Sequence, residues 1–465
     1  MKIQFPLFIL LVLLFFQTKS QSFVIHDVLV SSLDAKICDV EIDPLRKRIC
    51  WQSPDDDKLW VCHLDTNTWG LTVPDGKETL IDSTLTPIDQ TSNSGEWGYD
   101  QNGSYIVYNK EFNRKRYISL AAETGSTWSL CTLFDAPHRM NPHATKNPAD
   151  TFLAVHYIST LLTNYTKYKF LNNPTHEYWI HDFKDAHWAS DEQLLTGVLK
   201  NNHQVGLFDP ANPALPVQLT FDNGKVYSRP YMWRAPEHEN SRMIFANADG
   251  EEIRIFKEVS PGSNNYTLYM AFTSPSSNPV YRIIGSPEPC VYDGQSYISF
   301  MTSSSECETA CFPGEIWIAK IDSLAPIFRM ISDPSIGIRT DPETLATNDS
   351  LLVYYTEVDD TTGPAPVYRL KKCDTGFGIN LPTGTNENPG LKNTKLIVYP
   401  NPFQHRIALK NATGSERYEL ADKFGRTLWT GKYIGRKDFS YLPAGLYFLK
   451  VNAGNTINTI ELIKE

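Results

Sequence analysis

The stretches Glu96-Trp-Gly-Tyr-Asp100 and His187-Trp-Ala-Ser-Asp191 are two copies of a pattern that recurs along most of the chain. Each copy joins a short segment of strand-forming residues to a turn of the Asp-Gly or Asn-Gly type. Working outward from these two, seven copies align at marker positions 41, 96, 143, 187, 233, 289 and 343. Successive markers lie 44 to 56 residues apart, which is about the length of one four-stranded propeller blade.

The repeat predicts an all-β chain, with a seven-bladed β-propeller over residues 22–375 followed by a small C-terminal β-sandwich. Strand-like stretches such as Tyr105-Ile-Val-Tyr108 follow the markers, and the repeat region lacks the pattern of a long amphipathic helix. Residues 23–30 are expected to complete the last blade. The copies that contain tryptophan resemble propeller blades of the TolB type, a likeness that implies architecture and leaves the activity open.

The N-terminus has the pattern of a secretory signal peptide, which we place at residues 1–20. Lys2 precedes an almost uninterrupted apolar run from Phe5 to Phe16, and Ser20 supplies a small residue for cleavage. The run is shorter than the ~20 residues that a membrane-spanning helix needs, so a retained anchor is the weaker alternative. No membrane span is expected in the mature protein.

The length and charge of the chain limit the number of domains and the kind of partner that it can have. A chain of 465 residues exceeds most single hydrophobic cores, which predicts one large and one small domain. Residues 376–393 are enriched in Gly, Asn, Thr and Pro, and we interpret them as the linker. The formal net charge of −10 argues against nucleic acid as the main partner. A monomer is expected.

The last domain is predicted over residues 394–465, which carry Tyr399-Pro-Asn-Pro402 and Pro443-Ala-Gly-Leu-Tyr447. These motifs resemble the C-terminal sorting domain of proteins exported by type IX secretion. The resemblance implies a small β-sandwich, a bacterium of the Bacteroidetes type and the type IX secretion machinery as a partner. Together with the signal peptide, it predicts a protein that is secreted or held at the cell surface.

The candidate functional residues are expected at one face of the propeller, where inner strands begin and ligands commonly bind. His143 and His187 hold matching inner-strand positions of blades 3 and 4, and Tyr231 and Arg234 hold the corresponding stretch of blade 5. Loops on the same face would add four substrate-binding residues, namely His138, Arg229, Arg339 and Arg116. Each residue alone is compatible with a structural role, but together they imply an anionic substrate.

A uronic acid in a polysaccharide is one such substrate. Removing the proton α to its carboxylate needs a base, a cation against the developing charge, and an acid for the leaving oxygen. Histidine suits the base, tyrosine the acid, and arginine the carboxylate. We therefore predict a polysaccharide lyase in which His143, His187, Tyr231 and Arg234 are catalytic.

Two other functions remain open. One is a glycan-binding propeller without catalysis. The other is a propeller glycoside hydrolase that uses two carboxylates. The carboxylates available to it are Glu96, Glu288, Asp341 and Glu343.

The organisation of the chain, with Asn141-Pro-His143-Ala-Thr and Tyr231-Met-Trp-Arg234, resembles the exported seven-bladed ulvan lyases of polysaccharide lyase family 25. The resemblance implies β-elimination at uronic acid residues of ulvan, an acidic sulfated algal polysaccharide, by His, Tyr and Arg. It also implies a structural zinc ion.

The cysteines offer one place for that zinc. Cys290, Cys307 and Cys311 all fall in the predicted sixth blade, and His238 lies in the neighbouring blade. Three thiolates and one histidine would make a closed tetrahedral site of the structural kind. A disulfide between two of the three cysteines is the alternative, because the exported protein meets an oxidising compartment.

Overall fold

The computed structural model describes residues 25–27, 37–53, 58–67, 69–71, 78–83, 95–100, 103–112, 115–133, 139–145, 154–159, 165–171, 176–190, 193–222, 224–305, 313–321, 325–333, 335–360, 367–377, 397–399, 403–410, 417–423, 426–431, 434, 437–453 and 456–464. The predicted signal peptide and most of the predicted linker lie outside these residues. The chain divides into two compact units, Met1–Asn380 and Leu381–Glu465.

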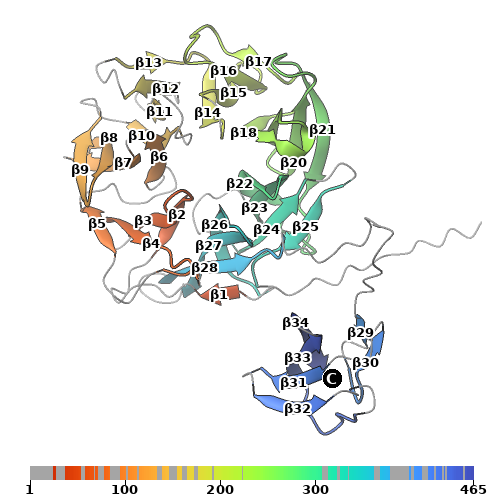
Figure 1. The fold of residues 1–465 in the computed structure, drawn as a ribbon. Helices are drawn as coiled ribbons and strands as arrows, with labels where there is room; N and C mark the ends of the chain where they lie inside the picture. Colours follow the sequence, from red (N-terminus) through yellow and green to blue (C-terminus); the bar gives the residue numbers. More distant parts are fainter. Residues whose placement is uncertain are drawn as a thin grey trace, which may run out of the picture. The chain divides into compact units, whose positions relative to one another are not determined.

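The described part of the first unit consists of seven four-stranded antiparallel sheets, numbered here in chain order (Figure 1). Sheet 1 is β2 (Cys38–Asp43), β3 (Arg48–Ser53), β4 (Lys58–His63) and β5 (Thr79–Asp82); sheet 2 is β6 (Glu96–Asp100), β7 (Gly103–Phe112), β8 (Lys115–Thr124) and β9 (Thr127–Thr132); sheet 3 is β10 (Arg139–Ala144), β11 (Ala154–Ser159), β12 (Tyr165–Phe170) and β13 (Tyr178–Trp179). Sheet 4 is β14 (Phe183–Trp188), β15 (Leu195–Leu199), β16 (Val205–Phe208) and β17 (Val217–Gln218); sheet 5 is β18 (Tyr227–Ala235), β19 (Ser241–Ala248), β20 (Glu252–Glu258) and β21 (Tyr266–Thr273). Sheet 6 is β22 (Ile283–Tyr292), β23 (Gln295–Ser303), β24 (Gly314–Lys320) and β25 (Ile327–Met330); sheet 7 is β26 (Ile338–Ala346), β27 (Leu351–Asp360), β28 (Val367–Asp374) and β1 (Ile25–Asp27).

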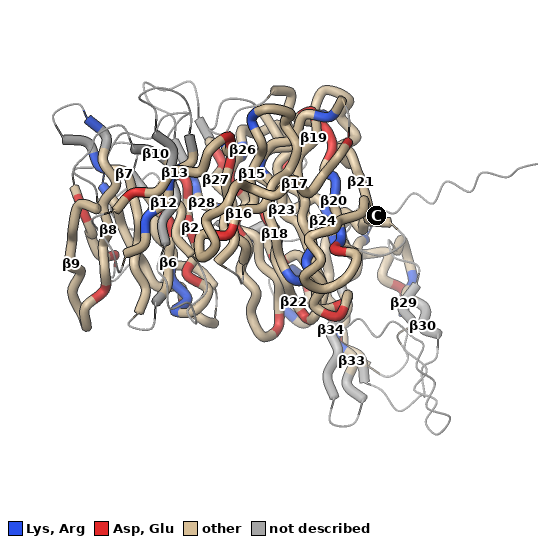
Figure 2. The backbone as a smooth tube through the Cα atoms, turned by 90° about the horizontal axis from the view of Figure 1, so that it is seen from above, with Lys and Arg blue, Asp and Glu red and all other residues tan. Residues whose placement is uncertain are grey.

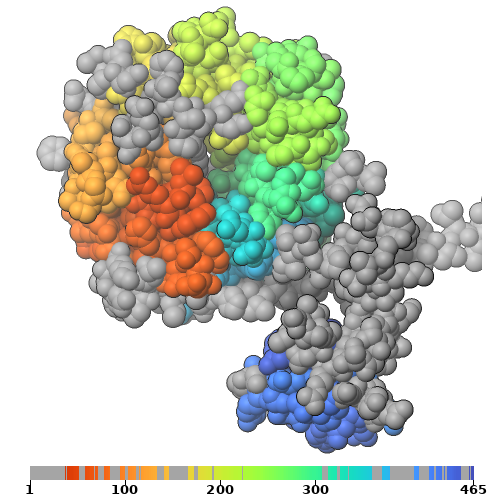
Figure 3. All heavy atoms as spheres, in the orientation of Figure 1, coloured from red at the N-terminus to blue at the C-terminus, as the bar shows by residue number. Residues whose placement is uncertain are grey.

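The sheets surround a common centre, with the first strand of each sheet innermost (Figure 1). Seen from the edge, the strands run between the two faces of the ring (Figure 2). Neighbouring sheets are packed against each other around the ring (Figure 3). The all-β, propeller-like architecture predicted from the repeat is therefore present.

The N-terminal strand closes the ring. Ile25 pairs with Cys373 and Asp27 with Lys371, so β1 supplies the outermost strand of sheet 7. Residues 25–27, the described part of residues 23–30, thus have the role that was expected. The other end is held by Phe377, which is buried and lies 4.9 Å from the ring of Tyr297. Packing of the first unit thus continues two residues past the predicted boundary at 375.

Tryptophans of the repeat tie one inner strand to the previous one. The indole nitrogen of Trp97 donates to the carbonyl of Glu41, and that of Trp188 donates to the carbonyl of His143, both at 3.0 Å. Both indoles are buried, where an unmade hydrogen bond is costly. In these two copies, the Trp therefore fixes the backbone of the marker residue on the preceding inner strand.

Six inner strands, β6 being the exception among those described, carry a bulge at the same place. At each bulge one residue, which we call the bulge residue, has a left-handed φ between 41° and 60°; the six are Asp39, Asn141, Asp185, Arg229, Ser286 and Asp341. Pairing with the second strand resumes two residues later, at Glu41, His143, His187, Tyr231, Glu288 and Glu343. We call these six, with Glu96 of β6, the ring residues.

The ring residues correct two predicted markers. In sheets 5 and 6 the equivalent residues are Tyr231 and Glu288 rather than positions 233 and 289. The reason is physical, because an inserted bulge residue shifts the alternation of side chains along a strand. The other five markers coincide with ring residues.

The second unit contains a two-stranded and a four-stranded sheet among the described residues. The first pairs β29 (Ile397–Tyr399) with β30 (Ala408–Lys410); the second has the order β32 (Thr427–Gly431), β31 (Arg417–Asp422), β33 (Gly445–Ala453) and β34 (Thr456–Lys464). A separate core that includes Phe403, Leu420 and Leu449 holds this unit together. Across the described residues of both units, the helical content is the 3-10 turn Pro236–His238 and the 3-10 residue Ile434, and no helix is suited to cross a membrane.

Candidate functional site

The bulges surround a cavity of about 370 Å³ at the inner strands. All six bulge residues line it, as do the ring residues of sheets 1 to 6. A bulge turns a side chain away from the regular pleat, which is why bulges are frequent beside functional sites. The size is within the usual range for small-molecule sites.

One arc of the cavity, over sheets 2 to 5, is a row of contacting polar and aromatic side chains. Nδ1 of His143 lies 3.1 Å from Oε1 of Glu96, and the His143 ring meets the His187 ring edge to face at 5.6 Å. His187 in turn stacks on Tyr231 at 3.9 Å between ring centroids. The structure thus brings together three of the four predicted catalytic residues and adds Glu96 as the partner of His143.

The opposite arc, over sheets 6, 7 and 1, is acidic. Glu288, Asp341, Asp39 and Glu41 line it. Asp39 and Asp341 are the bulge residues of the adjacent strands β2 and β26. Burial, followed by the charges of Asp39, Glu41 and Glu288, raises the pKa of Asp341 well above its usual range.

The predicted arginines separate into different environments. Arg229 is a bulge residue and is the one arginine among the described lining residues. Arg234 lies five residues further along β18 and donates to the carbonyl of Asn240 at 3.0 Å, outside the lining, so a catalytic role is not supported for it. Arg339 is also outside the lining.

Arg339 is a structural residue in this fold. Its side chain is buried, with Nε 2.6 Å from Oε2 of Glu357 and Nη1 bonded to the carbonyls of Gly314 and Ser335. These partners use the guanidinium donors, which corrects the prediction that it binds substrate. His138 lies outside the described residues. The backbone of Arg116 pairs with Glu111 in the β7–β8 hairpin.

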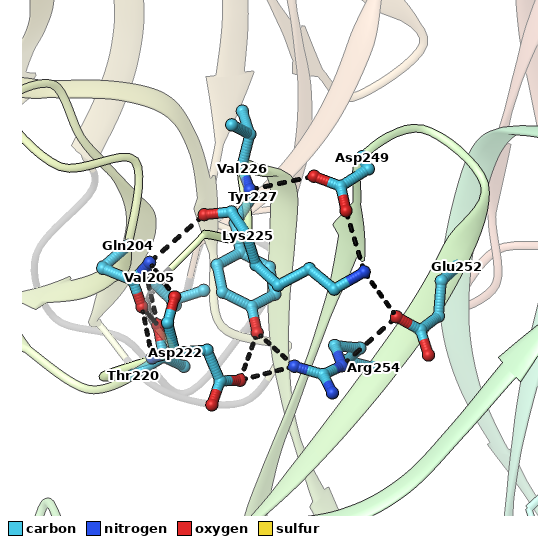
Figure 4. A network of polar contacts seen from close by, with 10 residues as sticks. All are labelled: Gln204, Val205, Thr220, Asp222, Lys225, Val226, Tyr227, Asp249, Glu252 and Arg254. Carbon is cyan, nitrogen blue, oxygen red and sulfur yellow. Dashed lines mark hydrogen bonds and ion pairs between the residues drawn. The ribbon is translucent and has the colours of Figure 1, made fainter.

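The segment that leads into β18 is fixed by the polar network of Figure 4. Asp222 accepts hydrogen bonds from the Tyr227 hydroxyl and from Nη1 of Arg254, both at 2.6 Å. Lys225 pairs with Asp249 at 2.8 Å and with Glu252 at 3.3 Å. Because Tyr227 is two residues before Arg229, this network anchors the strand that presents Arg229 and Tyr231 to the cavity.

The structure describes two of the four predicted zinc ligands, Cys290 and His238. Cys290 is a free thiol that pairs in the ladder with Tyr297, and burial raises its pKa to about 12. Cys307 and Cys311 themselves lie outside the described residues.

His238 is the other described member of the predicted zinc ligands. Its ring lies 5.0 Å from Tyr269, and burial, with Lys257 adding to it, lowers its pKa. Within the described residues, no cluster of three or more His, Cys, Asp or Glu side chains could hold a metal ion. No step below is routed through zinc.

Sequence reasoning missed Asp39, Glu41 and Asp185 as lining residues. A signal for the bulges was present, since proline follows the bulge residue in four of the six strands, at Pro142, Pro230, Pro287 and Pro342. Proline cannot donate to a sheet ladder and is confined to edges, strand starts and bulges. Asp and Asn also tolerate a left-handed backbone better than most residues.

One known protein family matches the second unit in sequence. Residues 397–465 match the family described as secretion system C-terminal sorting domain. This segment is a sorting domain of type IX secretion. The protein is therefore directed to the cell surface or the extracellular space. No curated protein matches the chain in sequence.

Solved structures share parts of the fold at low identity. Prolyl endopeptidase has 12% identity and a TM-score of 0.47, over 90% of this chain and 55% of that one. Sialidase from Trypanosoma rangeli has 8% identity and a TM-score of 0.40, over 73% of this chain and 60% of that one. TolB from Acinetobacter baumannii has 12% identity and a TM-score of 0.36, over 63% of this chain and 66% of that one. The chain spans less than two thirds of the first two structures, and these likenesses assign it no activity.

Proposed function

We propose that the first unit is a complete seven-bladed propeller and a polysaccharide lyase that cleaves an acidic polysaccharide of the ulvan type by β-elimination. The protein would act as a monomer, exported with the help of an N-terminal signal peptide. The observation that supports the proposal is the row of Glu96, His143, His187 and Tyr231 beside Arg229 at one cavity.

His143 is the base in this proposal. When Nδ1 carries a proton that it donates to Glu96, Nε2 keeps its lone pair for the substrate. Nε2 takes the proton from the carbon next to the uronate carboxylate. The electron pair of that C–H bond forms a carbon–carbon double bond, and the bond to the glycosidic oxygen breaks. Glu96 stabilises the imidazolium that results.

Tyr231 and Arg229 complete the step. The Tyr231 hydroxyl gives its proton to the departing oxygen and regains one from solvent. Arg229 faces the charge that develops on the uronate carboxylate as the proton is lost. His187 packs between the base and the acid, which holds both rings in place.

A second candidate, a glycoside hydrolase, is favoured by the acidic arc. Such enzymes use two carboxyl groups as acid and base, the acid having a raised pKa, as Asp341 has here. The two reactions differ in product, since elimination leaves an unsaturated uronate that absorbs in the near ultraviolet. Hydrolysis leaves reducing ends without that absorbance.

The test is the ultraviolet absorbance of the full chain mixed with ulvan, with alginate and pectate in parallel. We expect a rise with ulvan and a loss of about a hundredfold or more in the His143→Ala variant, because the base is removed. His176→Ala is the matched control, since His176 is exposed and outside the cavity lining. New reducing ends without absorbance would favour the hydrolase, and binding without either product would favour a glycan-binding protein.

A further inference from the structure

Two side chains in the wall of the cavity each have one polar atom without a hydrogen-bond partner. Thr166 of β12 and Asn247 of β19 both line the cavity, and only 1% and 4% of their surface is exposed. Within the part of the chain that the structure describes, neither Oγ1 of Thr166 nor Oδ1 of Asn247 has a partner. A buried polar atom that makes no hydrogen bond destabilises the folded state. Both atoms therefore gain from a ligand that supplies the missing bond.

Asn247 is held at the seam between sheets 5 and 6. Its backbone pairs with Ser228, the residue before the bulge residue Arg229. Its Nδ2 donates to the carbonyl of Ile284 on β22 at 2.7 Å, which fixes the amide and leaves Oδ1 as an acceptor. An acceptor needs a donor as its partner. A ligand hydroxyl therefore fits this atom, whereas an ionised carboxylate or a sulfate group does not.

Thr166 lies at the seam between sheets 3 and 4. Its strand β12 packs against β14, the inner strand that carries His187. A hydroxyl group can both donate and accept, so Thr166 can pair with a hydroxyl or with an ether oxygen of a sugar. The row of His143, His187 and Tyr231 spans sheets 3 to 5, so it has a neutral group that lacks one hydrogen bond on each side.

These neutral groups differ from Arg229 in what they can recognise. The guanidinium of Arg229 attracts an anion of any kind, so its charge does not distinguish a sugar acid from another acid. A buried group whose hydrogen bond is completed by a ligand hydroxyl discriminates against a ligand without that hydroxyl, because the group is then left unpaired. Thr166 and Asn247 would thus add selectivity for hydroxyl groups to the charge selectivity of Arg229.

We propose that Thr166 and Asn247 are specificity-determining residues that bind hydroxyl groups of the acidic sugar and of its neighbour in the polysaccharide. The inference rests on the proposed function in taking a polysaccharide that contains uronate as the ligand. Both residues act on affinity, and neither transfers a proton. Each makes in the complex a hydrogen bond that it lacks in the free protein.

The experiment is calorimetric titration with ulvan oligosaccharides of the full chain carrying His143→Ala, which should bind them without cleaving them. Thr166→Val, added to this parent chain, replaces the hydroxyl with a methyl group. We expect the dissociation constant to rise about tenfold, since one hydrogen bond to the ligand is lost. The Tm of the free protein should rise by about 2 °C, because a buried polar atom without a partner is removed.

Thr356→Val in the same parent chain is the matched control. Thr356 of β27 is fully buried, its Oγ1 also lacks a partner among the described residues, and it is outside the cavity lining. The substitution should raise Tm by a similar amount and leave the dissociation constant unchanged. Loss of affinity as large as that of Thr166→Val would show that a change in the core is enough to weaken binding, and would overturn the proposal.

Asn247→Leu removes the acceptor at the other seam. It also removes the bond to Ile284, so its control is Ser299→Ala, which loses a bond of the same kind from the second strand of sheet 6 to the carbonyl of Pro342 at 3.2 Å. Ser299 is buried and outside the cavity lining. We expect both variants to have a lower Tm, and Asn247→Leu alone to raise the dissociation constant, again about tenfold.

The outcomes separate this inference from the lyase. Weaker binding by Thr166→Val and Asn247→Leu supports the inference even where the chain with His143 forms no unsaturated product, a result that refutes the lyase alone. An unchanged dissociation constant in either variant overturns the inference, and the lyase stands if the chain with His143 forms that product. A lower Tm together with weaker binding in Thr166→Val would indicate a structural role and also overturns it. So does failure of the chains with and without His143 to bind oligosaccharides of ulvan, alginate and pectate.

Discussion

Among single residues, Glu96 illustrates how a buried carboxylate can serve a neighbour. It is largely buried at the start of β6, and its Oε1 faces Nδ1 of His143 at 3.1 Å. A carboxylate in this position fixes the orientation of the imidazole and stabilises its charged form. Glu96 should therefore affect the rate of proton transfer rather than the affinity for substrate.

The Glu96→Gln variant tests this role. Glutamine keeps a hydrogen-bonding oxygen near His143 but carries no charge, so the imidazolium formed in the reaction is less stable. We expect kcat for ulvan to fall about ten- to a hundredfold with KM nearly unchanged. The measurement is a steady-state rate series by ultraviolet absorbance. A rise in KM with kcat unchanged would mean that Glu96 acts on substrate binding instead.

At the level of elements, the sequence predicted that the inner strands would carry His143, His187 and Tyr231, which line the cavity, but not where each strand bends. The predicted markers His143 and His187 are ring residues. Both of these copies keep the repeat pattern on either side of the marker. Trp233 and Pro289 were taken as markers in place of Tyr231 and Glu288, because a bulge changes the alternation and cannot be seen in strand propensity. Of the acidic arc, Glu288 and Asp341 were named as candidate carboxylates, whereas Asp39 and Glu41 were missed.

Long-range partners were also beyond sequence reasoning. Arg339 was expected in a loop at the cavity, yet it lies within β26, and Glu357, 18 residues away on the next strand, holds its guanidinium. Asp39 and Asp341, on the adjacent strands β2 and β26, come from opposite ends of the first unit. Only closure of the ring brings such residues together.

The indole bonds between inner strands give a prediction for an element. Trp188→Phe removes the donor to the His143 carbonyl and should lower the free energy of unfolding by about 1–3 kcal/mol. Because β10 carries His143, kcat should fall as well. Trp97→Phe is the matched variant, since it removes the same bond to Glu41 in the acidic arc.

Denaturant unfolding and ultraviolet kinetics on both variants provide the measurement. We expect similar losses of stability and a larger loss of kcat for Trp188→Phe. Equal losses of kcat would show that the bond supports the fold as a whole rather than the position of the base.

For the whole molecule, ring closure is the feature that sets stability. Three residue pairs join β1 to β28, and without them sheet 7 loses its fourth strand. A chain that begins at residue 28 should have a Tm several degrees lower than one that begins at residue 21, because the exposed edge of β28 loses its hydrogen bonds. Deleting residues 397–465 should leave the Tm of the first unit unchanged, because the second unit has its own core.

Scanning calorimetry of the two truncated chains and the intact chain provides the comparison. A first unit that melts at the same temperature without β1 would show that closure does not depend on the terminal strand. A lower Tm after loss of residues 397–465 would show that the two units stabilise each other.

The bulges separate what holds the protein together from what it presents to a ligand. Backbone pairing continues on both sides of each bulge, and the buried core is made by other side chains of the same strands. Substitutions at the ring positions can accordingly accumulate while the scaffold stays the same. A library randomised at these positions would explore new chemistries on an unchanged architecture, and descendants of one ancestor could diverge in substrate by the same route.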